Sequence, residues 1–188
     1  MTISISKITS GIGLRINGEI FLVTEYSHVK PGKGGAFCRV KLKNVKTQQV
    51  LKKTFKPVDK LEEVILMEKK LKNLYQSGDS YHFMDLTSYE EAVVSKDVLG
   101  DAVKFLQDDL EVTGIYYNDD VLKIILPIFI TAEITHTEPG YKGDSSKAGT
   151  KPATIDTGTV MQVPLFVNTG DRIKIDTRTG SYVERVKQ

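Results

Sequence analysis

The sequence predicts an all-β protein made of three small domains, each a barrel or a sandwich. Apolar and polar residues alternate with a period of two in many short stretches, which is typical of half-buried strands. Turn residues separate these stretches at regular intervals, and that spacing favours small barrels or sandwiches. Helical spacing is confined to one stretch in the middle of the chain.

The strand assignments follow in chain order. The Asn17-Gly18 pair lies between apolar stretches and tolerates the positive φ angles of a tight hairpin turn. From Ala36 to Val45, apolar residues fall on one face of the expected strand and basic residues mostly on the other. Strands are expected at residues 14–23 (around the turn), 36–45, 50–55, 64–74, 81–84, 112–117, 121–126, 129–135, 160–167, 172–176 and 181–186.

Two stretches carry helix signals. Residues 98–106 place apolar side chains at helical spacing over about three turns. Thr87-Ser88-Tyr89-Glu90 fits a capping box and predicts a short helical turn. Helix is therefore a minor component.

The blocks of strands predict three domains, at residues 1–64, 65–128 and 129–188, and charge separates them. The net charge of +2 is the sum of unequal parts. Residues 1–64 carry 12 basic and 5 acidic side chains (+7), residues 65–129 carry 6 and 12 (−6), and residues 130–188 carry 8 and 7 (+1). A block at +7 is the electrostatic signature of a polyanion-binding surface, and a block at −6 should be repelled by a polyanion.

Composition excludes several classes of site. The single cysteine, Cys38, rules out an internal disulfide and a cysteine zinc site, and the three histidines lie far apart with no metal-ligand spacing. We therefore expect no metal and no cofactor. No apolar run reaches the ~20 residues of a membrane span, and the N-terminus lacks a signal-peptide pattern. We expect a cytoplasmic protein with no membrane partner.

A basic stripe is the first candidate binding surface. Arg39, Lys41 and Lys43 alternate along one strand, with Lys53 on the next. These side chains are expected to contact a phosphate backbone. The alternative is a solvated strand face that discourages edge pairing.

The second candidate is the glycine-rich loop at residues 28–36, which has Lys33 at its middle. Its glycines remove side-chain bulk beside the lysine, so Lys33 could extend far from the domain. The Walker phosphate-binding pattern is absent because Gly34 follows Lys33 where Ser or Thr is required. The alternative is an ordinary hairpin tip with an incidental lysine.

A third candidate is the polar loop at residues 140–150, whose small residues suit close approach to nucleic acid; a simple linker is the alternative. Enzyme signals are weak, because the acidic pairs lie beside turns and no nucleophile motif is present. Two alternatives stay open beside a polyanion-binding protein: a single-stranded RNA-binding module and an enzyme of unknown type.

Three motifs resemble the bacterial elongation factor P family, which is related to archaeal and eukaryotic initiation factor five-A. The resemblance spans the whole chain. The motifs are Lys30-Pro31-Gly32-Lys33-Gly34-Gly35-Ala36-Phe37, then Gly143-Asp144-Ser145, and the C-terminal series Lys151-Pro152-Ala153, Gly158, Val163-Pro164-Leu165-Phe166-Val167, Gly170 and Asp176-Thr177-Arg178-Thr179-Gly180-Ser181-Tyr182. The third motif is long and highly specific.

The resemblance implies an SH3-like (KOW-like) first domain and two OB-fold barrels in an elongated, transfer-RNA-like arrangement. It implies a non-enzymatic factor that binds the ribosome between the peptidyl and exit sites and promotes peptide-bond formation at consecutive prolines by positioning peptidyl transfer RNA. A monomer is expected.

The resemblance also assigns residues. Lys33 would be the loop-tip lysine that reaches the acceptor end of peptidyl transfer RNA, often extended by a separate modifying enzyme. The assigned residues are the supporting loop Lys30, Pro31, Gly32, Gly34 and Gly35; the transfer-RNA backbone contacts Arg39, Lys41, Lys43 and Lys53; the exit-site messenger codon loop Gly143, Asp144 and Ser145; and the C-terminal RNA or ribosome contacts Tyr182 and Arg185.

Overall fold

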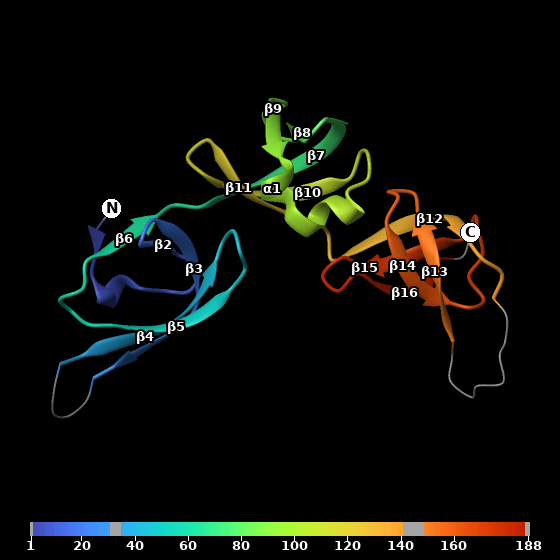
Figure 1. Ribbon diagram of the computed structural model, residues 1–188. Helices are drawn as coiled ribbons and strands as arrows, with labels where there is room; N and C mark the ends of the chain where they lie inside the picture. The colour runs from blue at the N-terminus through green and yellow to red at the C-terminus, as the bar shows by residue number, and fades with distance from the viewer. Residues whose placement is uncertain (1, 31–34, 141–148, 187–188) are drawn as a thin grey trace. The chain divides into compact units, whose positions relative to one another are not determined.

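The computed structural model describes residues 2–30, 35–140 and 149–186, which form three β-sheets in chain order (Figure 1). Each sheet is built mainly from segments consecutive in the sequence. Helical turns are short in these ranges, and none has the length and apolar character needed to cross a membrane.

The first sheet has the strand order β1-β6-β2-β3-β4-β5. Its strands are β1 (Thr2–Ile3), β2 (Gly13–Ile16), β3 (Glu19–Val29), β4 (Phe37–Asn44), β5 (Val50–Phe55) and β6 (Leu61–Val64), and the 3₁₀ turn η1 (Ile5–Lys7) follows β1. Asn17 and Gly18 have φ angles of 52° and 84° between β2 and β3, which confirms the predicted hairpin turn.

The core of this sheet comes from the predicted alternation. Along β4, Cys38, Val40 and Leu42 are buried, whereas the residues between them are exposed or half-buried. They pack with inward residues of the other strands and of η1. That core consists of Ile3, Ile5, Ile8, Leu14, Phe21, Val23, Cys38, Val40, Leu42, Phe55 and Leu61.

The second sheet has the order β11-β10-β7-β8-β9. Its strands are β7 (Met67–Ser77), β8 (Ser80–Asp85), β9 (Glu91–Ser95), β10 (Glu111–Tyr117) and β11 (Asp120–Ile125). The helix predicted at 98–106 is present as a short α1 (Lys96–Leu99) followed by the 3₁₀ turn η2 (Gly100–Phe105).

The helical turn predicted at Thr87–Glu90 is wrong. The Asp85 carboxylate accepts the N–H groups of Thr87 and Ser88 at 2.8 and 3.3 Å, and Tyr89 has a φ of 61°. These contacts close a tight turn between β8 and β9, because Asp85 acts as the local acceptor where the capping-box threonine was expected to do so.

The third sheet has the order β14-β13-β12-β15-β16. Its strands are β12 (Phe129–Thr137), β13 (Thr150–Ile155), β14 (Val160–Pro164), β15 (Arg172–Asp176) and β16 (Ser181–Arg185). Alternating residues form the core. The buried set is Phe105, Ile130, Ala132, Ile134, Ala153, Ile155, Met161, Val163, Val167, Ile173 and Ile175.

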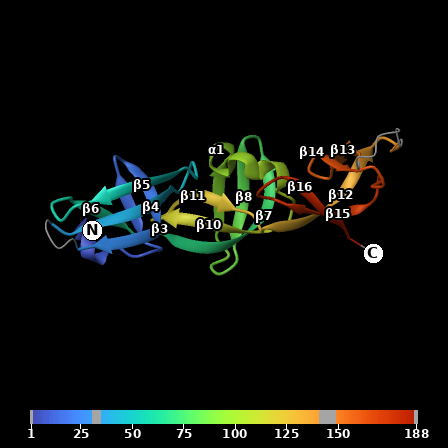
Figure 2. The same cartoon turned by 90° about the horizontal axis from the view of Figure 1, so that it is seen from below.

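Internal packing divides the chain into two compact units, one of residues 1–69 with 114–123 and one of residues 70–113 with 124–188. The tip of the β10–β11 hairpin therefore belongs with the first sheet, beside β3 and β4 (Figure 2). The sheets change between β6 and β7 and between β11 and β12, close to the predicted boundaries at 64/65 and 128/129. That each of the three blocks between these boundaries folds as an independent domain stays a prediction.

Phe105 fixes η2 to the third sheet. Its side chain is only 6% exposed and lies in the core of that sheet, although it comes from the preceding block of sequence. A Cβ atom on Gly180 would lie 3.3 Å from the Phe105 ring. The Lys104 carbonyl accepts the hydroxyls of Thr157 and Thr159, each at 2.7 Å. The helical segment is thus part of the C-terminal packing.

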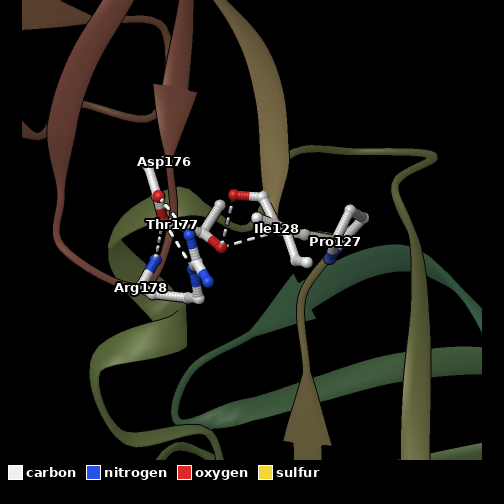
Figure 3. Close-up of polar contacts among 5 residues, drawn as sticks. All are labelled: Pro127, Ile128, Asp176, Thr177 and Arg178. Atoms are coloured by element: carbon white, nitrogen blue, oxygen red, sulfur yellow. Dashed lines mark hydrogen bonds and ion pairs between the residues drawn. The ribbon is translucent and has the colours of Figure 1, made fainter.

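The Asp176-Thr177-Arg178 turn ties β15 to the entry of β12 (Figure 3). The Thr177 hydroxyl donates to the Pro127 carbonyl at 2.7 Å, and the Thr177 N–H donates to the Ile128 carbonyl at 2.9 Å. Arg178 donates to both oxygens of the Asp176 carboxylate at 3.1 and 2.6 Å, and these bonds lower the pKa of Asp176. This part of the third motif is therefore structural.

We predict that Phe105→Ala destabilises the unit that contains the third sheet by about 3–5 kcal/mol, because it leaves a ring-sized cavity in a closed core. Urea unfolding followed by near-ultraviolet circular dichroism measures the change. The control is Phe166→Ala, whose ring is 57% exposed and which should cost much less. Equal losses for the two variants would contradict the placement of Phe105.

Candidate nucleic-acid interface

The outer face of β4 carries a row of cations. Arg39, Lys41 and Lys43 alternate with three buried residues, so all three point away from the first core, as predicted. The β3–β4–β5 register places Arg39 opposite Ser27 and Thr54, and Lys41 opposite Glu25 and Lys52. Strand pairing therefore holds the three side chains in fixed positions along the face.

One carboxylate interrupts this row. Lys41 Nζ lies 2.8 Å from Glu25 Oε1, and this ion pair, with Lys52 nearby, lowers the pKa of Glu25. Lys41 is thus partly neutralised. Arg39 has no acidic partner in the described ranges; its guanidinium carbon lies 5.3 Å from the centre of the Phe37 ring. Arg39 is the more available phosphate ligand of the two.

Lys53 occupies a different position from the other assigned cations. It pairs with Val40, so it leaves β5 on the core side at the sheet edge, where its ammonium lies 5.4 Å from the centre of the Phe55 ring. It still lines a shallow depression of about 260 Å³ on β3, β4 and β5. The lining residues are Glu25, Tyr26, Ser27, Arg39, Val40, Lys41, Lys52, Lys53 and Thr54.

Tyr26 is an aromatic that the sequence pattern missed. Its side chain is 44% exposed and lines the depression that Arg39 also lines. Its ring meets His28 edge-to-face, with 5.4 Å between ring centres. An exposed ring beside an arginine suits stacking on a nucleic-acid base. The expected strand ended at residue 23, whereas β3 continues to Val29, so the predicted alternation did not extend to Tyr26.

The ends of the glycine-rich loop are fixed by strand pairing. Val29 at the end of β3 pairs with Phe37 at the start of β4. Lys30 and Gly35 are exposed, whereas Lys33 with Pro31, Gly32 and Gly34 lies outside the described residues. Cys38 follows this loop and is fully buried, and burial raises the pKa of its thiol.

The structure brings Tyr182 and Arg185 together around a third residue, Phe166. The Phe166 and Tyr182 rings meet edge-to-face at 6.5 Å, and the Arg185 guanidinium lies 5.7 Å from the Phe166 ring centre. Asp171 holds Arg185 at 3.5 Å. Sequence reasoning treated Phe166 as part of a strand, but β14 ends at Pro164 and the ring is exposed.

Gly143, Asp144 and Ser145, which were predicted to meet the messenger codon, lie outside the described residues, but the flanks of their loop are well defined. A Cβ atom on Gly140 would clash with the Leu165 carbonyl oxygen, and one on Gly149 would lie 2.9 Å from Leu165 Cδ1. Lys151 is buried and donates to the Glu138 carbonyl at 2.6 Å, so its ammonium has a structural role.

The β10–β11 hairpin adds a lysine to the first sheet. Ile115 and Leu122 of the hairpin pack with Val45, and partly buried residues complete this cluster: Ile20, Leu22, Leu66 and Tyr117. Lys123 follows Leu122 and is half-buried. Burial and the nearby charge of Lys43 lower the pKa of Lys123 to about 8.

The described residues contain no group of three His, Cys, Asp or Glu side chains arranged to hold a metal. The candidate interface consists of cations and exposed rings. Such surfaces bind polyanions and stack on bases.

Family comparisons agree with this architecture. Models of the elongation factor P KOW-like domain, OB domain and C-terminal domain match residues 4–61, 66–124 and 130–185, respectively. The chain belongs to the elongation factor P family. This membership confirms the predicted all-β fold of three domains, and it makes the protein a member of a translation elongation factor family.

Relatives match this chain over nearly all of its length. Elongation factor P of Thermoanaerobacter sp. is 44% identical over 184 residues, which cover 98% of this chain and 100% of the relative. Elongation factor P of Acetivibrio thermocellus is 46% identical with the same coverage. A solved structure of a translation initiation factor eif-5a family protein from Naegleria fowleri covers 67% of this chain and 98% of that chain, with a TM-score of 0.51 and 14% identity. That likeness is one of fold.

We predict that the lowered pKa of Lys123 makes the free energy of unfolding depend on pH. Its pKa of about 8 in the folded protein is below the ordinary lysine value, so the folded state binds fewer protons than the unfolded state and stability rises as pH increases through and above 8. Lys123→Met should therefore be more stable than the parent at pH 7, with the difference shrinking toward pH 10. Urea unfolding at several pH values measures this, and a pH-independent difference would contradict it.

Proposed function

We propose that this protein binds the ribosome between the peptidyl and exit sites and promotes peptide-bond formation at consecutive prolines by positioning peptidyl transfer RNA. The observation that carries the proposal is the outward-facing cation row on β4, next to the loop that bears Lys33. Membership of a translation factor family supplies the setting.

Correct positioning of the peptidyl group is sufficient, in this proposal, to accelerate peptide-bond formation. Proline is a poor nucleophile in peptide-bond formation because its ring restricts approach, so correct placement of the peptidyl group lowers the barrier. The proposal requires no catalytic side chain, cofactor or metal from this protein, because the ribosome itself performs the chemistry.

Lys33 is the residue proposed to reach the acceptor end of peptidyl transfer RNA. The paired ends of β3 and β4 present the loop, and the cation can form charge-assisted hydrogen bonds with the RNA backbone. A separate enzyme is proposed to extend this lysine covalently. Lys30, Pro31, Gly32, Gly34 and Gly35 form the supporting loop.

The transfer-RNA backbone is proposed to lie along β4. Arg39 and Lys43 supply cations that no carboxylate in the described ranges neutralises, whereas Lys41 is shared with Glu25 and Lys53 lies at the β5 edge. At the other end of the chain, Tyr182 and Arg185 with Phe166 are proposed to contact RNA or the ribosome. Gly143, Asp144 and Ser145 are proposed to meet the messenger codon in the exit site.

A second function, binding of free single-stranded RNA, is favoured by one specific observation. Tyr26 and Phe166 are exposed, and each lies near an arginine, as in surfaces that stack bases. Micromolar or tighter binding of a free single-stranded RNA, without ribosome binding, would favour this function over the first.

We predict that Lys33→Ala abolishes the stimulation of consecutive-proline synthesis while the protein stays folded. The measurement is the rate of full-length product formation in a purified translation system with a messenger encoding consecutive prolines. Protein from its own host should be used, and its intact mass before and after proteolysis would reveal any covalent extension of Lys33.

The matched control is Lys60→Ala, which removes an exposed lysine from the same block outside the loop. That variant should keep most of the stimulation. Full activity of Lys33→Ala would refute the role of this lysine, and equal loss in both variants would mean that only total charge matters.

A further inference from the structure

Two rows of polar side chains cross the outer face of β3, β4 and β5. Directly opposed residues point to the same face of a sheet, and so do residues two apart along one strand. The register therefore places all six of these residues on the face that bears Arg39: Glu25, Lys41 and Lys52 in the Lys41 row, and Ser27, Arg39 and Thr54 in the Arg39 row. All six line the depression of about 260 Å³, and the row between them, which contains the buried Val40, forms its floor.

One carboxylate lies among the cations of this depression. Arg39, Lys41, Lys52 and Lys53 line it, and among the described residues that do so Glu25 alone is acidic. Glu25 Oε1 reaches across from β3 to within 2.8 Å of Lys41 Nζ, while its side chain stays 70% exposed. An ion pair this exposed contributes little to stability, so the carboxylate can leave Lys41 at a small cost.

Glu25 offsets a repulsion within the Lys41 row. Lys41 and Lys52 are directly opposite each other on β4 and β5, and like charges in that arrangement destabilise a sheet. The hydrogen bond and the charge of Lys41, and then the charge of Lys52, lower the pKa of Glu25, so its carboxylate interacts with both lysines. In the free protein this row already contains the anion that its two cations attract.

A phosphate group suits the same place and can make more contacts there. The two rows lie two residues apart along each strand, about 7 Å. A phosphate between them would accept charge-assisted hydrogen bonds from the lysines on one side and from Arg39 on the other. The hydroxyls of Ser27 and Thr54, on either side of Arg39 in its row, are further donors. The Glu25 carboxylate, by contrast, is bound to Lys41 in its own row.

We propose that a phosphate group of the RNA backbone binds in this depression between the two rows, and that Glu25 is an internal competitor which occupies the lysine side until the phosphate displaces it. This inference rests on the proposed function for the identity of the RNA. Lys52, Ser27 and Thr54 thereby join Arg39 and Lys41 as binding residues. The carboxylate stabilises the lysines of the free protein and at the same time lowers the affinity of the surface for RNA.

The test uses the full-length protein and bacterial ribosomes that carry peptidyl transfer RNA, with affinity measured over a series of salt concentrations. Glu25→Gln should tighten binding by roughly 2–5-fold at low salt, the range that an exposed ion pair corresponds to, and salt should reduce this gain by screening. The matched control is Glu62→Gln on β6 of the same sheet, which removes a carboxylate paired with Arg15 at 3.6 Å. Equal gains in the two variants would mean that only net charge matters and would contradict the proposal.

A double-mutant cycle separates competition from simple repulsion of RNA. In a Lys41→Met background, Glu25→Gln should give a clearly smaller gain, because the carboxylate no longer competes for that lysine. Lys52→Met should weaken binding by roughly 2–5-fold and reduce the slope of log K against log salt by about one, as expected for one lost phosphate contact. The same gain from Glu25→Gln in both backgrounds would overturn the role of competitor.

The source of the phosphate is tested on the free protein by NMR. The backbone amide signals of Glu25, Lys52 and Thr54 are followed while a short RNA duplex or inorganic phosphate is added at equal ionic strength. The proposal expects the RNA to saturate these shifts at a much lower phosphate concentration than inorganic phosphate does. Saturation at the same concentration would assign the depression to a free anion and overturn the RNA site.

Failure of this inference and failure of the proposed function give different results. Weaker ribosome binding in Arg39→Ala with unchanged binding in Glu25→Gln would overturn the competitor and leave the proposed function standing. Unchanged binding in Arg39→Ala and Lys52→Met would overturn the proposed RNA surface as well. Weaker binding in Glu25→Gln would mean that the carboxylate supports the surface rather than competing for it, which also contradicts the inference.

Discussion

The pairing of β4 between β3 and β5 is the constraint on which the first core and the cationic surface both depend. Because side chains alternate across a strand, the same register that buries Cys38, Val40 and Leu42 turns the intervening cations outward. A shift of one residue would bury the cations and expose the core. Fold and interface are therefore specified together along this strand.

The second sheet contributes to the packing of both of its neighbours in sequence. Its β10–β11 hairpin supplies Ile115 and Leu122 to a cluster with the first sheet, and η2 supplies Phe105 to the core of the third. Each contact buries apolar side chains from two consecutive blocks of sequence. Contacts of this kind add to the stability of small domains, because a small domain buries only a limited fraction of its own surface.

Sequence patterns predicted the strands well because their signals are local. The Asn17-Gly18 turn and the alternation along β4 depend only on neighbouring residues, and the structure confirms both. Thr87–Glu90 was predicted incorrectly because Asp85, just before the motif, supplies the acceptor that decides the turn. Local patterns carry no information about such competition between nearby acceptors.

The candidate site was predicted less completely, because much of it depends on contacts between distant segments. The β4 cations could be found by alternation, but Tyr26 lies beyond the strand expected at residues 14–23, and Phe166 lies beyond Pro164, where β14 ends. Lys123 belongs to an acidic block by sequence, so counting charge by block placed it far from the basic surface. Only the packing of the hairpin with Val45 shows that this segment joins the first sheet.

The flanks of the polar loop have a consequence for binding entropy. Gly140 and Gly149 both press against Leu165, and Lys151 binds the Glu138 carbonyl, so the chain leaves the third sheet and returns to it at one place. The conformational entropy of joining the loop ends is lost when the sheet folds. A partner that meets this loop therefore does not have to offset that loss, and more of its contact energy is available as affinity.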